Sequence, residues 1–441
     1  MQPITSKEIS KLLNYSSPII DTIINEVSTD SRKVDSNTLF IAIKGENFDG
    51  HDFIEDVINK GTPLVITEKQ IKNVDPKHQI IVPDTLKAFG KLAQHNRSFY
   101  KGKLIALTGS SGKTTTKELL KTALSVYDKT YATTGNYNNH IGVPRTLLDI
   151  DMTAPYAIVE MGMSALKEIE YLTQLASPDI ALVTNVYPMH IEFLKTLENI
   201  AIAKSEIYQG LNSHGIAVYN ADTSFADILK TNAQKHTKNI HSYSINDTLT
   251  LSKLSLEDNS PHRQSNALAV LKIVELLGLD ISKAIPAINN FSALEGRGKK
   301  HNLTIDNKNI LLIDDSYSGQ PEAMKLAINS LNSLKTNGRK IALLGKMAEL
   351  GDYTKKAHIE IGQTLNNTNI DIVIGVCEET KDMLSILDKK IEQYYFENIS
   401  SIPEFLVNDL LQNNDTILIK GAHYSSAVFK VAKYLIDYNS K

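Results

Sequence analysis

The hydrophobic pattern divides the chain into short apolar runs and longer segments with helical spacing. Near the amino end, Thr5 and Glu8 have the spacing of a capping box, which predicts a helix over residues 9–13. Residues 86–100 repeat apolar positions every three or four residues, as a second helix would. Apolar runs of strand length occupy residues 39–43, 64–67 and 79–82. This part of the chain is expected to form a small mixed α/β unit.

From residue 103 onward, apolar runs and helical segments alternate regularly. The first region has expected strands at residues 104–107, 156–159, 180–184 and 216–219, and expected helices at 115–127, 191–211 and 265–277. A connector over residues 291–300 leads to a second region. Its expected strands are 310–313, 340–344, 370–374 and 416–419, and its expected helices are 322–334, 355–365 and 426–436. Such alternation predicts parallel sheets covered by helices on both faces, the second sheet being the smaller.

Composition supports a globular chain and excludes several classes of protein. A length of 441 residues suggests about three domains, which we expect over residues 1–102, 103–295 and 296–441. The 47 basic and 50 acidic residues give a formal charge of −3, which argues against a nucleic-acid binder. A single cysteine excludes an internal disulfide, and no apolar run approaches the roughly 18 residues of a membrane helix. We therefore expect a soluble cytoplasmic protein without membrane insertion.

The strongest chemical signal lies between an expected strand and an expected helix. Residues 108–116 read Thr-Gly-Ser-Ser-Gly-Lys-Thr-Thr-Thr, in which small residues let backbone N–H groups surround phosphates at a helix start. Lys113 is expected to reach the β- and γ-phosphates, and the Thr114 hydroxyl to bind Mg²⁺. A glycine turn with a solvated lysine is the alternative. The residues expected to contact ATP are Gly109, Ser110, Ser111, Gly112, Lys113, Thr114 and Thr115.

Only two residues separate Gly109 from Gly112, whereas an ordinary phosphate loop has four between its glycines. This spacing resembles the Mur ligase superfamily, whose members use ATP to join an amino group to a carboxylate. Further motifs in chain order, from Thr29 to Gly421, resemble its MurF branch, which adds D-alanyl-D-alanine to UDP-N-acetylmuramoyl-tripeptide. The resemblance implies a small N-terminal α/β domain for the UDP-sugar, a central phosphate-loop ATPase-like parallel sheet, and a Rossmann-like C-terminal domain for the dipeptide.

Two motifs in the first domain resemble the part of the MurF family that holds the UDP-sugar. They read Thr-Asp-Ser-Arg at residues 29–32 and Phe-Asp-Gly-His at residues 48–51. The resemblance implies substrate contacts by Ser31, Arg32 and Asp49. A surface ion pair between Asp30 and Arg32 is the structural alternative.

The polar loop at residues 134–144 also follows the family pattern. By resemblance, Asn136 and Asn138 bind substrate, and Asn139 is a catalytic residue near the γ-phosphate. On its own, an Asn-Gly cluster signals only a turn.

Three further residues of the middle domain are implied to bind metal together with Thr114. Glu160 follows an expected strand, and ligands of α/β sheets gather at the carboxyl ends of strands. By resemblance, Glu160 and His190 are catalytic magnesium ligands; because His is unusual for Mg²⁺, a second, mixed site is expected. By the same resemblance, Lys204 is carbamylated by CO₂ and becomes an anionic ligand, although a helical lysine is ordinarily solvated. Two Mg²⁺ ions are therefore expected.

The border between the second and third domains carries the remaining residues implied to contact ATP. By resemblance, Asn266 contacts adenine, and Arg297 and Asp315 hold the ribose and phosphates. A polar helix start is the alternative for Asn266. Since an acyl phosphate must be shielded from water, we expect the third domain to rotate onto the second about a hinge at residues 294–300.

The third domain departs from the family pattern at four positions. Serine and glutamine replace asparagines at Ser318 and Gln320, lysine replaces an acid at Lys346, and histidine replaces arginine at His423. The last two changes alter charge.

Taken together, the motifs predict a monomeric MurF-type ligase in peptidoglycan precursor synthesis. Two alternatives stay open: a superfamily ligase with another amine substrate, and a non-catalytic nucleotide-binding relative.

Overall fold

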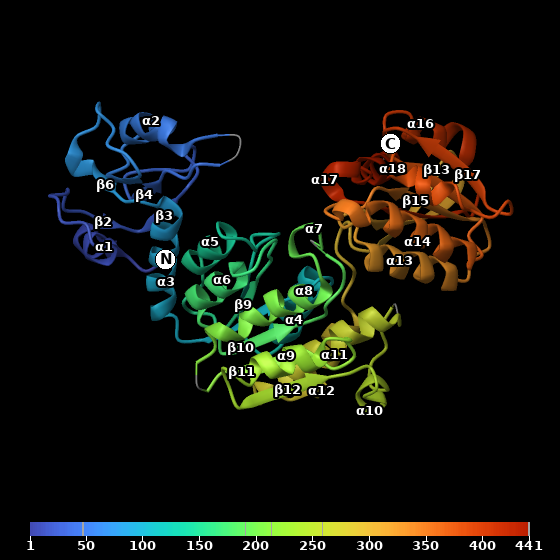
Figure 1. The fold of residues 1–441 in the computed structure, drawn as a ribbon, viewed down its shortest axis with the longest axis horizontal. Helices are drawn as coiled ribbons and strands as arrows, with labels where there is room; N and C mark the ends of the chain where they lie inside the picture. The colour runs from blue at the N-terminus through green and yellow to red at the C-terminus, as the bar shows by residue number, and fades with distance from the viewer. Residues whose placement is uncertain (46–47, 190, 213, 258, 440–441) are drawn as a thin grey trace.

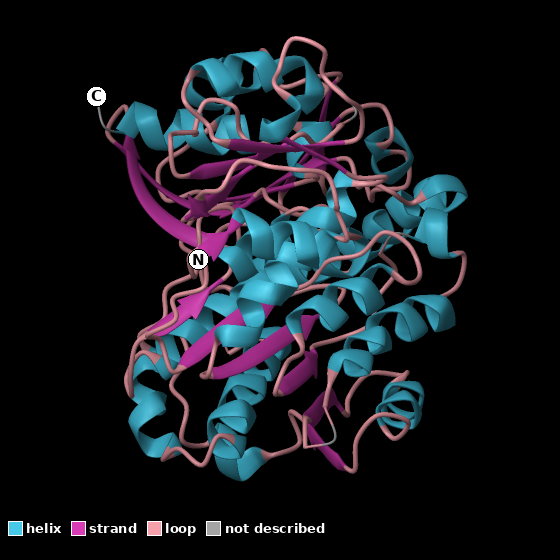
Figure 2. Ribbon diagram, turned by 90° about the vertical axis from the view of Figure 1, so that its left-hand side faces the viewer, coloured by secondary structure: helices cyan, strands magenta, loops and turns pink. Residues whose placement is uncertain are grey.

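The computed structural model describes residues 1–45, 48–189, 191–212, 214–257 and 259–439. They fold into three α/β bodies in chain order, and the first and third bodies each border the middle one (Figure 1). Figure 2 shows the sheets edge-on with helices packed against their faces. Across the described ranges, no helix is long and apolar enough to span a membrane.

The first body is built on a parallel four-stranded sheet in the order β3-β4-β5-β6. Its strands are β3 (Glu26–Ser28), β4 (Thr38–Ile41), β5 (Leu64–Thr67) and β6 (Gln79–Ile81), beside an antiparallel pair of β1 (Ile4–Thr5) and β2 (Ile23–Ile24). Its helices are α1 (Ser6–Leu13), α2 (Ile54–Asn59) and α3 (Thr85–Phe99). The predicted capping box is confirmed, because Thr5 Oγ1 accepts from the Glu8 N–H at 3.2 Å and Glu8 Oε2 accepts from the Thr5 N–H at 2.8 Å.

The middle body contains a parallel six-stranded sheet in the order β12-β11-β10-β7-β9-β8. The strands are β7 (Lys103–Thr108), β8 (Thr130–Ala132), β9 (Tyr156–Glu160), β10 (Ile180–Val183), β11 (Ile216–Asn220) and β12 (Asn239–Tyr243). The helices are α4 (Lys113–Leu124), α5 (Gly142–Leu148), α6 (Glu168–Ala176), α7 (Ile191–Leu194), α8 (Leu197–Ser205), α9 (Ala226–Ala233), α10 (Thr248–Leu251), α11 (Pro261–Leu276) and α12 (Ile281–Asn289).

Successive residues of β7 face two different hydrophobic cores. Leu104 and Ala106 pack in a core that continues into the first body, whereas Ile105 and Leu107 pack with α4, α11 and α12. Because both faces are buried, the strand reads as an uninterrupted apolar run, and this is why the sequence predicts it correctly.

The third body contains a six-stranded sheet in the order β13-β14-β18-β15-β16-β17, parallel except for β13. The strands are β13 (Lys299–Ile305), β14 (Lys308–Asp315), β15 (Lys340–Gly345), β16 (Ile372–Val376), β17 (Glu392–Phe396) and β18 (Thr416–Lys420). The helices are α13 (Pro321–Ser333), α14 (Thr354–Asn366), α15 (Thr380–Leu384), α16 (Ile402–Phe405), α17 (His423–Ser426) and α18 (Phe429–Asn439). The prediction of a smaller sheet is wrong, because in the described residues it equals the middle sheet in strand number.

Two predicted helices are interrupted. The helix predicted over residues 191–211 is α7, α8 and a 3-10 turn, η3 (Glu206–Gly210). Lys195 has a φ of 68°, which ends α7, and Thr196 then caps α8 by accepting from the Asn199 N–H. The helix predicted over residues 426–436 begins only at Phe429, because Ala427 is left-handed with a φ of 56°.

Candidate functional site

The phosphate loop lies between β7 and α4 at the carboxyl edge of the middle sheet, in the strand–loop–helix setting that the sequence predicts. Its glycines are required by their surroundings. A Cβ added to Gly109 would lie 1.9 Å from Thr184 Oγ1. Gly112 precedes α4 with a φ of 75°, a left-handed conformation that favours glycine. The loop backbone is thus held at a helix start, where an anion is electrostatically favoured.

The end of β10 supports this loop from behind, a feature that the sequence analysis missed. Asn185 Oδ1 accepts from the Ser111 N–H at 2.8 Å, and Asn185 Nδ2 donates to Ser111 O at 2.9 Å. Thr184 Oγ1 donates to the same carbonyl at 3.0 Å. Ser110 Oγ donates to Tyr187 O at 3.0 Å. The polar residues that follow the apolar run at 180–183 are the signal that would have indicated this support.

Lys113 begins α4, and its Nζ donates to Gly109 O at 2.8 Å, so the side chain folds over the loop. Desolvation lowers the pKa of Lys113. The Glu160 carboxylate opposes this shift, and the Arg297 guanidinium from the third body adds to it. Glu160 of the middle body and Arg297 of the third body thus influence the charge of Lys113 in opposite directions.

Glu160 ends β9 beside the loop and is 1% exposed. Its Oε1 accepts from Thr114 Oγ1 at 3.2 Å and from Asn138 Nδ2 at 2.8 Å. Its Oε2 is buried and has no hydrogen-bond partner among the described residues. A buried carboxylate oxygen without a donor, next to a threonine hydroxyl, has the chemistry of a hard-cation site and fits Mg²⁺.

The structure separates the asparagines of the polar loop. Asn138 contacts Glu160, whereas Asn136 and Asn139 are exposed. Asn139 Oδ1 accepts from the N–H groups of Ile141 at 3.1 Å and Gly142 at 2.9 Å, and so caps the start of α5. The amide oxygen of Asn139 is therefore engaged in a helix cap, which sequence spacing alone did not reveal.

Lys204 lies near the end of α8 and is 2% exposed. Burial, and to a smaller extent the charge of Lys113, lower the pKa of Lys204 well below its ordinary value. Within the described part of the chain its amine makes no hydrogen bond. The other predicted ligand, His190, lies outside the described residues.

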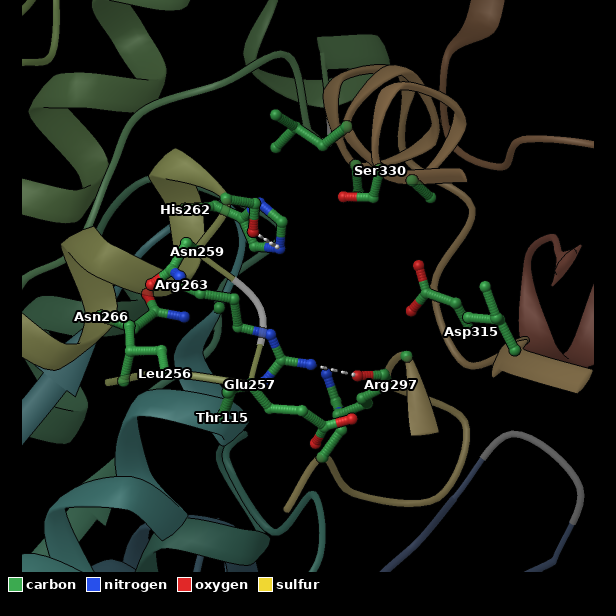
Figure 3. A pocket seen from close by; sticks show the side chains of 18 of the residues that line it. Thr115, Leu256, Glu257, Asn259, His262, Arg263, Asn266, Arg297, Asp315 and Ser330 are labelled. Carbon is green, nitrogen blue, oxygen red and sulfur yellow. Dashed lines mark hydrogen bonds between the residues drawn. The ribbon is translucent and has the colours of Figure 1, made fainter. Parts of the chain in front are cut away.

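A cavity of about 620 Å³ lies between the middle and third bodies beside the phosphate loop (Figure 3). Its volume is in the range of small-molecule sites. Predicted ATP contacts line it from both sides: Ser111, Gly112, Thr115 and Asn266 from the middle body, and Arg297 and Asp315 from the third. In Figure 3, Asn266 and Thr115 lie opposite Asp315 across the opening. The structure thus brings together residues that are far apart in the sequence.

The cavity residues of the third body are held by contacts that the sequence analysis did not foresee. The Arg297 guanidinium lies 4.0 Å from the centre of the Tyr317 ring, and Arg263 Nη2 donates to Arg297 O at 3.1 Å. Lys420, which is 1% exposed, donates to Asp315 Oδ2 at 2.7 Å. These interactions fix the orientation of both predicted ATP contacts before any ligand arrives.

The predicted sugar-binding residues lie in the first body and do not line this cavity. Arg32 forms a bidentate ion pair with Asp30, at 2.8 and 2.9 Å, and these bonds lower the pKa of Asp30. Asp49 Oδ1 lies 2.6 Å from His51 Nδ1, and its pKa is lowered mainly by the His51 backbone N–H. Ser31 O accepts a hydrogen bond of 3.1 Å from Nζ of Lys60, the residue that follows α2. The surface ion pair between Asp30 and Arg32, given as the structural alternative, is therefore present.

The departures from the family pattern are only partly accommodated in the third body. Lys346 forms an ion pair with Glu379 at 3.0 Å. His423 stacks on Phe429 with ring centres 4.1 Å apart. Ser318 O accepts from Lys420 at 2.8 Å, and Gln320 precedes α13. Gln320 Oε1 and His423 Nδ1, however, are buried without a hydrogen-bond partner among the described residues.

Three regions of the chain match models of known families. Residues 23–97 match "Mur ligase family, catalytic domain", residues 107–288 match "Mur ligase middle domain", and residues 302–423 match "Mur ligase, glutamate ligase domain". The matches follow one another in chain order and together include most of the sequence.

Individual proteins match over nearly their whole length. The UDP-N-acetylmuramoyl-tripeptide–D-alanyl-D-alanine ligase of Buchnera aphidicola is 35% identical, over 94% of this chain and 93% of its own. Among solved structures, MurF from Acinetobacter baumannii has a TM-score of 0.87 at 26% identity and covers 100% of both chains. MurF ligase from Thermotoga maritima in complex with ADP has a TM-score of 0.81 at 26% identity, over 94% of this chain and 98% of that one.

Proposed function

The chain belongs to the Mur ligase family, and from that premise we infer that it uses ATP to join D-alanyl-D-alanine to UDP-N-acetylmuramoyl-tripeptide. The observation that carries this inference is the meeting of Lys113, Thr114 and Glu160 at one sheet edge, beside a cavity lined by two bodies. The reaction is a step of peptidoglycan precursor synthesis. Because its substrates are a nucleoside triphosphate and a nucleotide-linked sugar, we propose that the reaction takes place in the cytoplasm. We also propose that the enzyme acts as a monomer.

ATP is proposed to bind across the cavity. The phosphate loop and the start of α4 receive the phosphates, and Lys113 exchanges its bond to Gly109 O for one to a phosphate oxygen. Asn266 is placed to contact the base, with Arg297 and Asp315 approaching from the third body. The ADP complex of the Thermotoga relative supports a nucleotide in this fold.

The chemistry proceeds in two steps. A carboxylate oxygen of the tripeptide attacks the γ-phosphorus of ATP, forming an acyl phosphate and releasing ADP. The neutral amine of the dipeptide then attacks the acyl carbon, and the tetrahedral intermediate expels phosphate and loses a proton to give the amide. Lys113 stabilises the charge of the transferring group, and Asn136, Asn138 and Asn139 are proposed to orient the carboxylate.

Magnesium is proposed at the buried oxygen of Glu160, with the Thr114 hydroxyl beside it. When bound, Mg²⁺ neutralises negative charge on the phosphates during transfer. A second ion would use Lys204 as a carbamate, with His190 completing the ligand set. The first body is proposed to hold the UDP-sugar through Ser31, Arg32 and Asp49.

Lys204 is suited to carbamylation because only a neutral amine adds to CO₂, releasing a proton. Its lowered pKa provides that neutral form, and the absence of a hydrogen-bond partner in the described residues leaves the amine free to react. Lys117 and Lys420 are equally buried, but each donates to fixed oxygen atoms. Of these three lysines, Lys204 is therefore the one expected to be modified.

Changing Lys204 to alanine should lower kcat on the order of 10³-fold, because about 4 kcal/mol of metal-bound charge stabilisation is lost. Changing the exposed Lys230 of α9 to alanine should have no effect. Carbon-13 NMR of protein equilibrated with labelled bicarbonate should show one carbamate signal, absent from the Lys204→Ala variant. An identical signal in that variant would refute the assignment.

The third body is proposed to bring the dipeptide to the acyl phosphate and to rotate about residues 294–300. Gly296 and Gly298 both have positive φ in this connector, with values of 69° and 85°. Such residues are suited to a backbone that changes direction between bodies. The third body departs from the family pattern at several positions, including Lys346 and His423. Of the three substrates, the amine is therefore the one whose identity the sequence specifies least.

Mass spectrometry of the product tests the substrate assignment. With ATP, Mg²⁺ and UDP-N-acetylmuramoyl-tripeptide, adding D-alanyl-D-alanine should give the corresponding pentapeptide, whereas free D-alanine or a single L-amino acid should not. A product with another amine in preference to the dipeptide would favour a sister ligase. No product with any amine would favour the non-catalytic alternative.

A further inference from the structure

Lys117 lies one turn beyond Lys113 on α4, and its side chain has no exposed surface. Its Nζ donates to the carbonyl oxygens of Thr133 at 2.7 Å and Gly135 at 3.0 Å. Glu118 Oε1 lies 3.0 Å from the same nitrogen and provides a third partner. The two hydrogen bonds and the ion pair together hold the ammonium group in one orientation.

The two carbonyl groups belong to residues 133–138, a segment that wraps around Glu160. At its start, Thr133 Oγ1 accepts from the Glu160 N–H at 3.1 Å. At its end, Asn138 Nδ2 donates to Glu160 Oε1 at 2.8 Å, and Asn138 O accepts from the Gly162 N–H at 2.7 Å. The segment is thus fastened to the end of β9 at both ends and to α4 through Lys117.

Lys117 also provides charge next to the buried carboxylate. Its Nζ lies 3.9 Å from Glu160 Oε2, the oxygen that has no hydrogen-bond partner in the described residues. A buried carboxylate without a nearby cation is strongly unfavourable. Lys113 does not hold this segment, because its Nζ donates to Gly109 O within the phosphate loop.

We propose that Lys117 is a positioning residue for the ligase reaction, an inference that rests on the proposed function. Lys117 keeps segment 133–138, with Asn136 and Asn138, in fixed register with the helix that receives the phosphates of ATP. The attacking carboxylate and the γ-phosphate are thereby held in one relative geometry. A misplacement of about 1 Å at such a site costs on the order of 10²-fold in rate.

Lys117→Met removes both the charge and the donors, and Lys117→Gln keeps a donating N–H₂ group without the charge. Lys121→Met, one turn further on the exposed side of α4, is the matched control. In Lys117→Met, we expect kcat to fall about 10²-fold and the KM for UDP-N-acetylmuramoyl-tripeptide to rise about 10-fold. Calorimetric binding of ADP without Mg²⁺ should change less than about 3-fold, because the phosphate loop is untouched. Lys117→Gln should recover part of the KM, and the control should match the unsubstituted protein.

Hydrogen exchange provides a readout that does not depend on activity. In the unsubstituted protein, the amides of Tyr137 and Asn138, which donate to Thr134 O and Asn136 O, should be protected, and Lys117→Met should reduce that protection. Unchanged protection and KM in Lys117→Met, or parallel losses of ADP and tripeptide binding, would overturn the proposal. If the variants do not fold, exchange in the unsubstituted chain is the test. Rapid exchange of the Tyr137 and Asn138 amides would overturn the proposal, whereas slow exchange that becomes slower with ADP would support it. If the unsubstituted protein does not join tripeptide and dipeptide, the proposed function is refuted. The ADP-binding and hydrogen-exchange measurements do not depend on that activity, so they still test the role of Lys117.

Discussion

Replacing Lys113 with alanine is expected to lower the rate of phosphate release by at least about 10³-fold, because removing a single preorganised donor from a developing charge already costs about 10²–10³-fold and Lys113 carries a full charge. Its position at the start of α4, near both Glu160 and Arg297, leaves no other lysine of this loop to take its place. Rapid-mixing measurements of phosphate release with saturating ATP, tripeptide and D-alanyl-D-alanine would record the loss.

The same substitution should not weaken the fold. Desolvation lowers the pKa of Lys113, which means that folding disfavours its charged form, and removing the amine relieves that cost. The thermal midpoint of Lys113→Ala should therefore equal or exceed that of the unsubstituted chain. Lys121→Ala, on the exposed side of the same helix, is the control for helix propensity. Retention of more than a tenth of the activity by Lys113→Ala would contradict the role assigned to this residue.

Changing Glu160 to glutamine is expected to produce the second large effect, a fall in kcat on the order of 10³-fold, equivalent to about 4 kcal/mol of charge stabilisation through Mg²⁺. Glutamine is nearly isosteric, so the amide oxygen still accepts from Thr114 and Asn138. The loss therefore reports the missing charge rather than a collapsed site. Titration of activity with Mg²⁺ should show that a higher concentration is required for half-maximal rate.

Glu275→Gln on the surface of α11 is the matched control, because Glu275 is exposed and pairs with Lys272 at the surface. This control should leave both the rate and the Mg²⁺ requirement unchanged. If Glu160→Gln kept the Mg²⁺ requirement and most of its rate, the metal would have to bind elsewhere.

The features that the sequence predicted correctly depend on local pattern or on sheet geometry. The phosphate loop could be recognised because one short stretch contains its glycines, lysine and threonine between a buried strand and a helix. Glu160 could be placed at the same edge because parallel strands end together, and β7 and β9 are neighbours in the sheet.

Other features arise only from tertiary packing. Lys113, Lys117 and Lys204 are all lysines of helical segments, and the sequence does not show that Lys117 is fully enclosed or that Lys204 has no fixed partner. The support of Ser111 by Asn185 joins residues 74 positions apart. Asn139 is drawn into capping α5, because the first N–H groups of a helix need acceptors.

Edge strands explain why the sequence predicted only four strands in each of the middle and third sheets, which both have six. β17 reads Glu-Gln-Tyr-Tyr-Phe and lies at the edge of its sheet, as does the polar β13 at the opposite edge. An edge strand exposes one side to solvent and carries polar residues that weaken the apolar signal. Only the buried inner strands were visible as apolar runs, so β13 and β17 were missed, as were the edge strands β8 and β12 of the middle sheet.

The dependence of phosphate release on D-alanyl-D-alanine is the most direct test of the inferred reaction. With ATP, Mg²⁺ and UDP-N-acetylmuramoyl-tripeptide, phosphate should stay near background until the dipeptide is added, and should then equal the amount of pentapeptide formed. That result follows if the acyl phosphate is shielded from water until the amine attacks it. Phosphate release at the same rate without the dipeptide, or none in its presence, would contradict the account.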